Sequence, residues 1–519
     1  MPRNNVKIVN VSDYILMRKI NTKTIEKGET DDMELLNKKM TEKKERPVKV
    51  LQFGEGNFLR AFVDYMIDIA NERGEFDGDI VLVKPIEAGN LDYIKEQDCR
   101  YTVQLRGIVD GEPKRSNRIV TSVCDAVDAY KEYEKYASYA KSETLRFVVS
   151  NTTEAGIVYD DTDRLEFTPP RTYPGKLTKF LYERYQYFQG AEDKGLIILP
   201  VELIDDNGIY LKEYIQKLAV LWKLEEGFLD WVNRACVVTS TLVDRIVTGY
   251  PRDEAEEIWR ELGYQDRMLV TGEPFALWVI ESEKDISREL PLPQAGLPVV
   301  FTDNQKPYKQ RKVRILNGAH TSFVLASYLC GNDIVLEAMN DSLIYRFMKE
   351  TIFDEIIPTL TLPAQELIDF ANAVIARFQN PYVKHDLLAI SLNSVSKWRA
   401  RCMPSLLGYL EREKTLPAHL AFSLAALMVF YTGSQIRDHV LIGHRDGQEY
   451  EIKDDMTVLE FFADHSVKNA EEYTRAVLSH KEFWGQDLSV LPGMEQAVCS
   501  YISEIRTLGM RAAIEKIFV

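Results

Sequence analysis

Short apolar runs alternate with helically spaced apolar residues over the N-terminal part of the chain. Val48–Phe53 predicts a buried strand, and apolar residues then recur every three or four positions over Phe58–Ile69, which predicts a helix. Asp79–Val83 and Arg146–Ser150 predict two further strands. This alternation of strands and amphipathic helices is typical of an α/β domain built on a doubly wound parallel sheet.

The pattern changes at Leu290-Pro-Leu-Pro-Gln-Ala-Gly-Leu-Pro298, where three prolines and a glycine end any regular element. Beyond this segment, apolar residues keep helical spacing almost throughout. The helical segments lie near 321–351, 363–403, 418–432 and 456–517. We therefore predict a charged extension over 1–47, an α/β domain over 48–292 and a mostly α-helical C-terminal domain over 293–519.

Two segments of these domains carry turn signals. Asp110-Gly111 stands between the alternating segments Tyr101–Ile108 and Arg118–Val123, which predicts an antiparallel hairpin inserted into the first domain. The histidine-containing segment 439–447 ends in Asp-Gly, and we interpret it as a loop.

A glycine-rich turn joins the first predicted strand to the helix that follows it. Gly54 would permit a tight turn, and Gly56 would let a pyrophosphate approach the backbone N–H groups at the helix N-terminus. Leu59 occupies the place of the third glycine or alanine of the usual fingerprint. Strand, glycine turn and helix together indicate a Rossmann-like dinucleotide site, to which Asn57, Phe58 and Arg60 are expected to contribute.

Two other strand ends bear on the cofactor. The strand that begins at Arg146 leads into Asn151, Thr152 and Glu154, a polar strand end of the kind that faces ligands in open α/β sheets; a capped turn at a helix start is the alternative. The strand over 79–83 ends in Lys84 instead of the acidic residue that often binds the adenosine ribose. A cation there would suit the extra phosphate of NADP, so the pattern leaves the choice between NAD and NADP open.

Candidate proton-transfer chemistry lies just past the proline-rich segment, in Lys312-Val-Arg-Ile-Leu-Asn317-Gly-Ala-His320. On a helix the three polar side chains would lie at about 0°, 140° and 80°, which allows them to converge on one ligand. Lys312 would exchange a proton with an alcohol or alkoxide, helped by the flanking charges of Arg311 and Arg314. Asn317 and His320 would hydrogen-bond the reacting oxygen. An ordinary helix with exposed polar residues is the alternative.

Composition and charge argue against several classes of protein. The 519 residues carry a net charge of −16, which argues against a nucleic-acid partner. There is no apolar run near the ~20 residues that cross a bilayer and no signal-peptide core, so a cytoplasmic location is expected. The six cysteines form no Cys-x-x-Cys pair and the seven histidines no His-Glu-x-x-His pattern, so no metal is expected. The oligomeric state does not follow from the sequence.

Five motifs in fixed order carry a resemblance. They are Gly54-Glu-Gly-Asn-Phe-Leu-Arg-Ala61, Thr153-Glu-Ala-Gly156, Leu242-Val-Asp-Arg-Ile246, Glu273-Pro-Phe-Ala-Leu-Trp-Val-Ile-Glu281 and the spacing of Lys312, Asn317 and His320. From about Val48 to near the C-terminus, the chain resembles the mannitol dehydrogenases, a family of long-chain, zinc-independent dehydrogenases. The resemblance implies NAD as cofactor, Lys312 as general acid/base, Asn317 as oxyanion donor and His320 as the residue that positions the carbonyl.

The resemblance also implies a small sugar acid derived from a hexuronate, with tagaturonate and altronate as the keto acid and the alcohol. Mannitol and fructuronate enzymes of the family carry a Cys-Asp-Asn run, whose asparagine is a second oxyanion donor; here Val201-Glu202-Leu203 stands in its place. Glu202 or Asn207 would have to substitute, or Asn317 would act alone. Fructuronate or a neutral polyol remains an alternative substrate, and a nicotinamide-binding sensor without turnover is the alternative class.

A sugar acid needs a cation for its carboxylate. His385, Lys397 and Arg401 in the helical domain are the candidates, and we favour Lys397 or Arg401; stabilisation of a helix surface is the alternative. Arg245 is also kept as a substrate-binding candidate, although its place after Asp244 suggests a structural ion pair near the cofactor.

Overall fold

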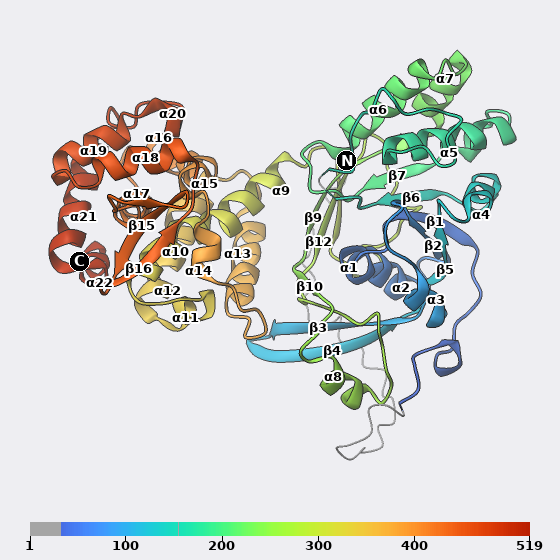
Figure 1. Ribbon diagram of the computed structural model, residues 1–519, viewed down its shortest axis with the longest axis horizontal. Helices are drawn as coiled ribbons and strands as arrows, with labels where there is room; N and C mark the ends of the chain where they lie inside the picture. The colour runs from blue at the N-terminus through green and yellow to red at the C-terminus, as the bar shows by residue number, and fades with distance from the viewer. Residues whose placement is uncertain (1–32, 154, 519) are drawn as a thin grey trace. The chain divides into compact units, whose positions relative to one another are not determined.

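The computed structural model describes residues 33–153 and 155–518, which form two compact units (Figure 1). The first unit ends at Gln305 and the second begins at Lys306. The boundary between the units lies after the proline-rich segment. Strand β13 (Val299–Thr302), which follows that segment, pairs in parallel with β12 (Leu277–Glu281) and therefore belongs to the first unit.

A six-stranded, wholly parallel sheet lies at the centre of the first unit, in the order β5-β2-β1-β6-β7-β8. Its strands are β1 (Val48–Phe53), β2 (Asp79–Lys84), β5 (Val123–Asp128), β6 (Phe147–Ser150), β7 (Ile197–Pro200) and β8 (Val237–Val238). The chain leaves β1 toward β2 on one side and later returns to β6 on the other. The carboxyl ends of β1 and β6 thus form the switch point at which open α/β sheets bind ligands.

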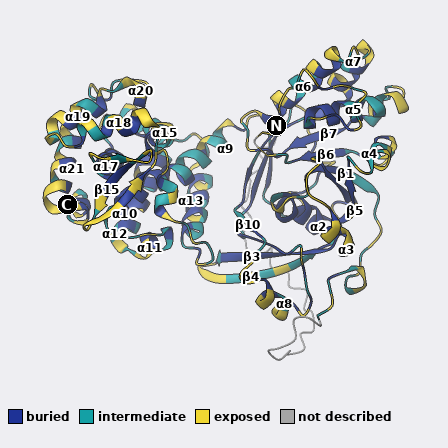
Figure 2. Ribbon diagram, viewed as in Figure 1, coloured by how far each residue is buried: buried dark blue, intermediate teal, exposed yellow. Residues whose placement is uncertain are grey.

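Helices cover both faces of this sheet, because successive strand residues point to opposite sides. Val50 belongs to one apolar core and Leu51 and Phe53 to the other, and Figure 2 shows the strands buried between them. The first core includes the continuous helix formed by α1 (Asn57–Leu59), the π-helical turn η3 (Arg60–Asp64) and α2 (Tyr65–Glu72), together with α3 (Asp92–Glu96). The second core lies under α4 (Tyr133–Ser138), α5 (Tyr173–Tyr187), α6 (Asn207–Leu221) and α7 (Glu226–Ala235). The predicted doubly wound α/β domain is confirmed.

The predicted hairpin is also present. β3 (Tyr101–Val109) and β4 (Glu112–Val120) pair antiparallel, and both turn residues have positive φ, 55° at Asp110 and 79° at Gly111. The second strand begins at Glu112, earlier than predicted. The unit is completed by β9 (Ser240–Asp244), β10 (Val247–Gly249), β11 (Val270–Gly272), α8 (Ala255–Leu262) and the short helices η2 (Lys38–Met40), η4 (Tyr139–Lys141) and η5 (Glu192–Lys194).

The second unit is mostly helical, as predicted, and packs around α10 (Gly318–Leu329) and the almost fully buried α17 (Ala418–Phe430). The α-helices around these two are α9 (Lys306–Arg311), α11 (Val335–Asn340), α12 (Ser342–Glu350), α13 (Ala364–Phe378), α14 (Leu387–Ser391), α15 (Ser394–Arg401), α16 (Met403–Glu413), α18 (Met456–His465), α19 (Ala470–Leu478), α20 (Lys481–Trp484), α21 (Met494–Leu508) and α22 (Met510–Ile517). The π and 3-10 turns are η6 (Lys312–Asn317), η7 (Thr351–Ile356) and η8 (Ile357–Thr359).

The prediction of a loop over residues 439–447 is wrong. A three-stranded antiparallel sheet stands there, formed by β14 (Ile436–Arg437), β15 (Val440–Arg445) and β16 (Gln448–Ile452). Asp446 and Gly447, with φ of 52° and 80°, make the same two-residue hairpin turn as Asp110 and Gly111. Within the described ranges, every helix is too short or too polar to span a bilayer.

Candidate functional site

The glycine turn after β1 has a shape that only glycine permits. Gly54 has a φ of +118°, and a Cβ atom there would lie 2.9 Å from the backbone oxygen of Asn151. Gly56 precedes α1 as its N-cap, has no side-chain cap, and a Cβ atom there would meet nothing within 4 Å. Open space in front of uncapped backbone N–H groups is what a pyrophosphate requires. Leu59, in place of the third glycine, is buried in the core beneath the turn.

Arg60 supports the turn from the protein side. Its buried guanidinium donates to the backbone oxygen of Glu55 at 3.2 Å, to Oδ1 of Asn57 at 2.6 Å and to the backbone oxygen of Met268. Arg60 therefore shapes the predicted cofactor site, while the exposed Asn57 lies at its surface. Phe58, half-buried, stacks on Phe62 with ring centroids 5.0 Å apart.

At the neighbouring strand end, a buried carboxylate organises the backbone. Glu202 accepts hydrogen bonds from the Thr152 backbone N–H at 3.1 Å, the Thr152 hydroxyl at 2.9 Å and the Ser150 hydroxyl at 3.1 Å. Burial raises the pKa of Glu202. The amide of Asn151 donates to the backbone oxygen of Val201 at 2.8 Å. No helix starts here, and Glu154 lies outside the described residues.

Lys84, the cation at the end of β2, is fully buried, and all its hydrogen-bond donors have partners within the protein. Its ammonium pairs with Asp128 at 3.1 Å and donates to the backbone oxygens of Ile86, Glu87 and Ala88 at 2.6, 3.0 and 3.2 Å. An ammonium has three hydrogens to donate, so these partners saturate it. Lys84 therefore holds the loop over 86–88 and does not offer its charge to a phosphate, contrary to the reason for considering NADP.

Two residues of the first unit that were predicted to bind the substrate, Asn207 and Arg245, donate their hydrogen bonds to the backbone instead. The amide nitrogen of the fully buried Asn207 donates to the backbone oxygens of Pro200, Glu202 and Thr241 at 3.3, 3.0 and 3.1 Å. Arg245 donates to the backbone oxygens of Ala61, Pro274 and Phe275 at 2.6, 3.1 and 3.0 Å. These bonds leave Asn207 no donor for a substrate, and they give Arg245 a structural role between separate segments.

In the second unit, Lys312 begins a π-helical turn inside a continuous helix from Lys306 to Leu329. The backbone N–H of Gly318 donates to the oxygen of Val313, five residues earlier. The arrangement of Lys312, Asn317 and His320 therefore departs from the regular α-helix assumed from the sequence. All three side chains are partly exposed, and π-turns occur frequently at functional sites.

The flanking arginines turn away into the second unit. Arg311 is buried, 4.5 Å from the Phe370 ring centre and 3.8 Å from a Glu366 carboxylate oxygen. Arg314 donates to the Thr359 hydroxyl at 3.1 Å. Both therefore have contacts that support the helix.

The imidazole of His320 is enclosed by rings and cations. It stacks on Phe378 with ring centroids 4.1 Å apart and meets His385 edge-on at 5.3 Å. Burial, followed by the nearby charges of His385, Arg377 and Arg401, lowers the pKa of His320 well below its usual value. Its Nε2 makes no hydrogen bond with any residue of the described ranges. His320 is thus neutral at neutral pH, with one ring nitrogen available to a ligand.

Helix α15 brings two cations to this place. A Cβ atom on Gly318 would lie 3.2 Å from the backbone oxygen of Arg401, so glycine lets α15 approach the π-turn closely. Arg401 donates to the Thr321 hydroxyl at 3.4 Å, and Lys397 to the backbone oxygen of Ile390 at 2.9 Å. Burial lowers the pKa of both cations. Among residues 33–153 and 155–518, no carboxylate forms an ion pair with either one.

The structure thus gathers His320, His385, Lys397 and Arg401 beside the helix that carries Lys312 and Asn317. Sequence patterns did not predict the π-turn or the stacking partner Phe378, because Phe378 carries no signal beyond its apolar helical spacing.

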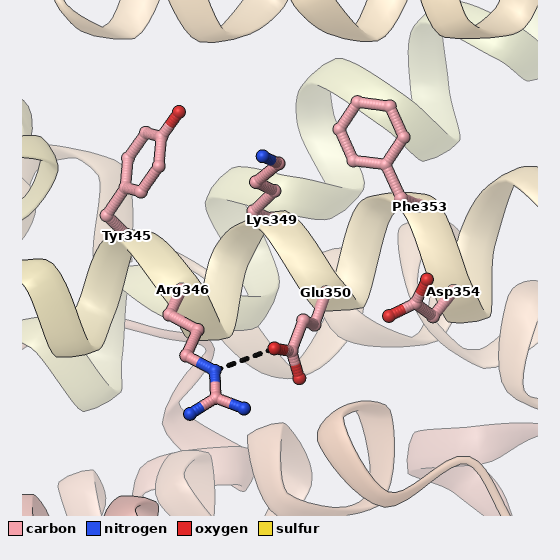
Figure 3. A pocket seen from close by; sticks show the side chains of 6 residues that line it. All are labelled: Tyr345, Arg346, Lys349, Glu350, Phe353 and Asp354. Carbon is pink, nitrogen blue, oxygen red and sulfur yellow. Dashed lines mark hydrogen bonds and ion pairs between the residues drawn. The ribbon is translucent and has the colours of Figure 1, made fainter. Parts of the chain in front are cut away.

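A separate surface hollow on α12 and η7 is lined by Tyr345, Arg346, Lys349, Glu350, Phe353 and Asp354 (Figure 3). It contains none of the predicted site residues. The described residues hold no group of three side chains suited to a metal ion.

Two family models match the chain. The Mannitol dehydrogenase Rossmann domain matches residues 48–294, and the Mannitol dehydrogenase C-terminal domain matches residues 304–505. The altronate oxidoreductases of Pectobacterium atrosepticum, Yersinia pestis and Escherichia coli are 45%, 43% and 44% identical to it, each over 93% of this chain and 99% of the relative. Within the family, the sequence motifs most resemble this branch, also called tagaturonate reductases.

Solved structures agree in fold. A D-sorbitol dehydrogenase in substrate-free form gives a TM-score of 0.74 at 21% identity, over 90% of this chain and 95% of the other. The Pseudomonas fluorescens mannitol 2-dehydrogenase, in a ternary complex with NAD and D-mannitol, gives 0.61 at 22% identity, over 91% and 95%. With both family models matched in order over most of its length, the chain belongs to the mannitol dehydrogenase family.

Proposed function

We propose that the protein is a zinc-independent oxidoreductase that transfers hydride between NAD(H) and a hexuronate-derived sugar acid, reducing D-tagaturonate to D-altronate. Relatives more than 40% identical over nearly their whole length bear the name altronate oxidoreductase. The single observation that carries the acid specificity is the pair of half-buried cations, Lys397 and Arg401, with which no carboxylate of the described ranges forms an ion pair.

NAD fits the first unit. The turn at Gly54 and Gly56 offers uncapped backbone N–H groups to a pyrophosphate, and Asn57 and Asn151 border it. Because Asp128 and three backbone oxygens saturate Lys84, its charge does not favour the extra phosphate of NADP. When bound, NADH supplies the hydride that reduces the keto carbon.

The second unit supplies the proton and holds the substrate. In the reducing direction, the Lys312 ammonium donates a proton to the carbonyl oxygen as that oxygen gains negative charge; in the oxidising direction, the neutral amine removes the hydroxyl proton. The Asn317 amide donates a hydrogen bond to the same oxygen, which stabilises its charge. Since His320 is neutral, its ring orients the substrate by hydrogen bonding without adding a second acid.

The carboxylate of the substrate would bind Arg401 and Lys397. A cation that is partly desolvated and lacks an internal counter-ion gains most from an anionic ligand, and a guanidinium binds a carboxylate through two parallel hydrogen bonds. His385, whose pKa burial lowers, would line the same place as a neutral hydrogen-bonding group.

Replacing each cation by methionine tests this assignment. Arg401→Met and Lys397→Met are expected to lower kcat/KM for tagaturonate by about 30-fold or more, equivalent to about 2 kcal/mol, and to change that for fructose, a neutral ketose, far less. Arg399→Met, on the exposed side of the same helix, is the matched control and should affect neither substrate. Equal losses on tagaturonate and fructose would remove the carboxylate role.

Loss of NADH absorbance with tagaturonate, fructuronate and fructose offered in parallel separates the proposed substrate from the alternatives. A preference for fructuronate would indicate the fructuronate/mannonate pair, and a preference for fructose would indicate a polyol dehydrogenase. NADH binding without turnover of any of the three would indicate a sensor. We further propose a cytoplasmic location, which fractionation of the native cells tests.

A further inference from the structure

The strands β1, β6 and β7 are neighbours in the central sheet and end level with one another (Figure 1). In the parallel register, Ser150 lies opposite both Phe53 and Pro200. The backbone N–H of Asn151 donates to the oxygen of Phe53 at 3.0 Å, and that of Val201 donates to the oxygen of Ser150 at 2.8 Å. Since neighbouring strands lie about 4.8 Å apart, the end of β7 is about 10 Å from the glycine turn across the sheet.

The two sides of the glycine turn suit different halves of a dinucleotide. In a doubly wound sheet, the end of the second strand holds the adenosine ribose, and the pyrophosphate lies at the glycine turn of the first. Here β2 lies on one side of β1, and β6 and β7 lie on the other. The nicotinamide half of the cofactor is therefore expected on the side of β6 and β7.

A buried carboxylate stands on that side. Glu202 follows the end of β7 by two residues and is 2% exposed. Its Oε1 accepts hydrogen bonds from the N–H and the hydroxyl of Thr152, and its Oε2 accepts one from the hydroxyl of Ser150. An ionised carboxylate only accepts, so three converging donors stabilise its negative charge. Such an acceptor does not supply the second oxyanion donor that was considered for Glu202.

The hydrogen-bond partners of Glu202 are all neutral. Over residues 33–153 and 155–518, no lysine, arginine or histidine forms an ion pair with it. On the adenosine side, by contrast, Asp128 is paired with Lys84 at 3.1 Å. Burial raises the pKa of Glu202, and the hydrogen bonds from Thr152 and Ser150 oppose that rise. A buried charge without a counter-ion is costly, and a ligand that brings the opposite charge removes that cost.

We propose that Glu202 is the counter-charge of the oxidised nicotinamide ring and sets the relative affinity of the protein for NAD+ and NADH. The inference rests on the proposed binding of NAD to the first unit. The ring of NAD+ carries a positive charge, which hydride addition removes, while the rest of the cofactor keeps its charge. The carboxylate therefore attracts the oxidised form and leaves the neutral, reduced ring almost unaffected. On the protein this favours hydride transfer from NADH to the keto acid.

Calorimetric titration of the full-length protein with NAD+, NADH and ADP-ribose, which lacks the nicotinamide, tests the proposal. Glu202→Gln keeps the shape of the side chain: its amide oxygen still accepts from Thr152, and its amide nitrogen donates to the Ser150 hydroxyl. The variant should bind NAD+ about 10-fold more weakly, the effect of a unit charge about 12 Å away at an effective dielectric constant of about 20. NADH and ADP-ribose should bind as they do to the wild type.

Two further variants separate charge from shape. Glu202→Asp keeps the negative charge on a shorter side chain, which loosens its bonds to Thr152, so the ratio of NAD+ to NADH affinity should stay at the wild-type value. Asp206→Asn removes an exposed carboxylate of the same loop, at a left-handed backbone position (φ 55°) that asparagine tolerates. Because water weakens the field of that exposed charge, all three affinities should stay unchanged.

The three ligands distinguish the counter-charge from a purely structural role. Equal weakening of NAD+, NADH and ADP-ribose in Glu202→Gln would show that Glu202 only holds the strand end, and would overturn the proposal. Wild-type NAD+ affinity in Glu202→Gln would overturn it as well. If Glu202→Gln does not fold, Glu202→Asp decides, and a changed ratio in that variant refutes the counter-charge. If the wild type binds none of the three ligands, the proposed function itself fails.

Discussion

Replacing Asp64 by asparagine should change how the stability of the fold depends on pH. The side chain is completely buried, and its pKa is raised from 3.8 to about 7 in the folded state. The folded protein therefore binds this proton more tightly than the unfolded chain does. The corresponding stabilisation is fully present below the unfolded value and is lost as pH rises through about 7. Asparagine has the same shape and no such titration.

The size of this change in the free energy of unfolding follows from how far the pKa of Asp64 is raised. One pKa unit corresponds to about 1.4 kcal/mol, so the wild type should lose about 2.5 kcal/mol relative to Asp64→Asn between about pH 5 and about pH 8. All other titrating groups are shared by the two proteins and cancel in the difference.

Urea unfolding of both proteins at a series of pH values measures this difference. Asp161→Asn, an exposed aspartate of the same unit, is the control and should show no trend. If the free-energy difference between wild type and Asp64→Asn stays constant within about 0.5 kcal/mol over the series, Asp64 titrates like an exposed acid and the reasoning from burial is refuted.

Three further substitutions have defined outcomes. Lys312→Ala should lower kcat by about 100-fold or more while NADH affinity is kept, because only proton transfer is lost; intact turnover with tagaturonate would exclude Lys312 as the acid/base. Lys84→Met removes the buried cation of Asp128 and leaves only the exposed Lys131 ammonium, 3.9 Å away, so it should cost about 3 kcal/mol in thermal unfolding without improving NADPH binding. A gain in NADPH affinity would instead assign Lys84 to the cofactor. Gly54→Ala forces a Cβ atom against the Asn151 carbonyl at positive φ and should abolish NADH binding in a titration, and wild-type affinity would contradict the geometry of the turn.

Local patterns predicted much of the first unit. The strand over 48–53 has the predicted bounds, and the glycine turn after it follows from the residues themselves, because apolar periodicity and positive φ are properties of short segments. The same signal was available at Asp446-Gly447, where a hairpin stands in place of the predicted loop. There the flanking strands are polar on one side and carry histidine, which obscured the alternation.

The sequence by itself determined the α/β-then-helical order, the family and the chemical identities of the candidate residues. Only the tertiary structure decided which of those residues remain available to a ligand. Lys84, Asn207 and Arg245 are polar residues at plausible places, but their donors are already used. Those of Lys84 go to the Asp128 carboxylate and the nearby loop over 86–88, and those of Asn207 and Arg245 go to backbone oxygens that include distant segments. In the described ranges, by contrast, Nε2 of His320 has no hydrogen-bond partner and no carboxylate forms an ion pair with Arg401. The physical reason is that a buried polar group must find hydrogen bonds somewhere, and the folded arrangement of separate segments alone fixes where they are found.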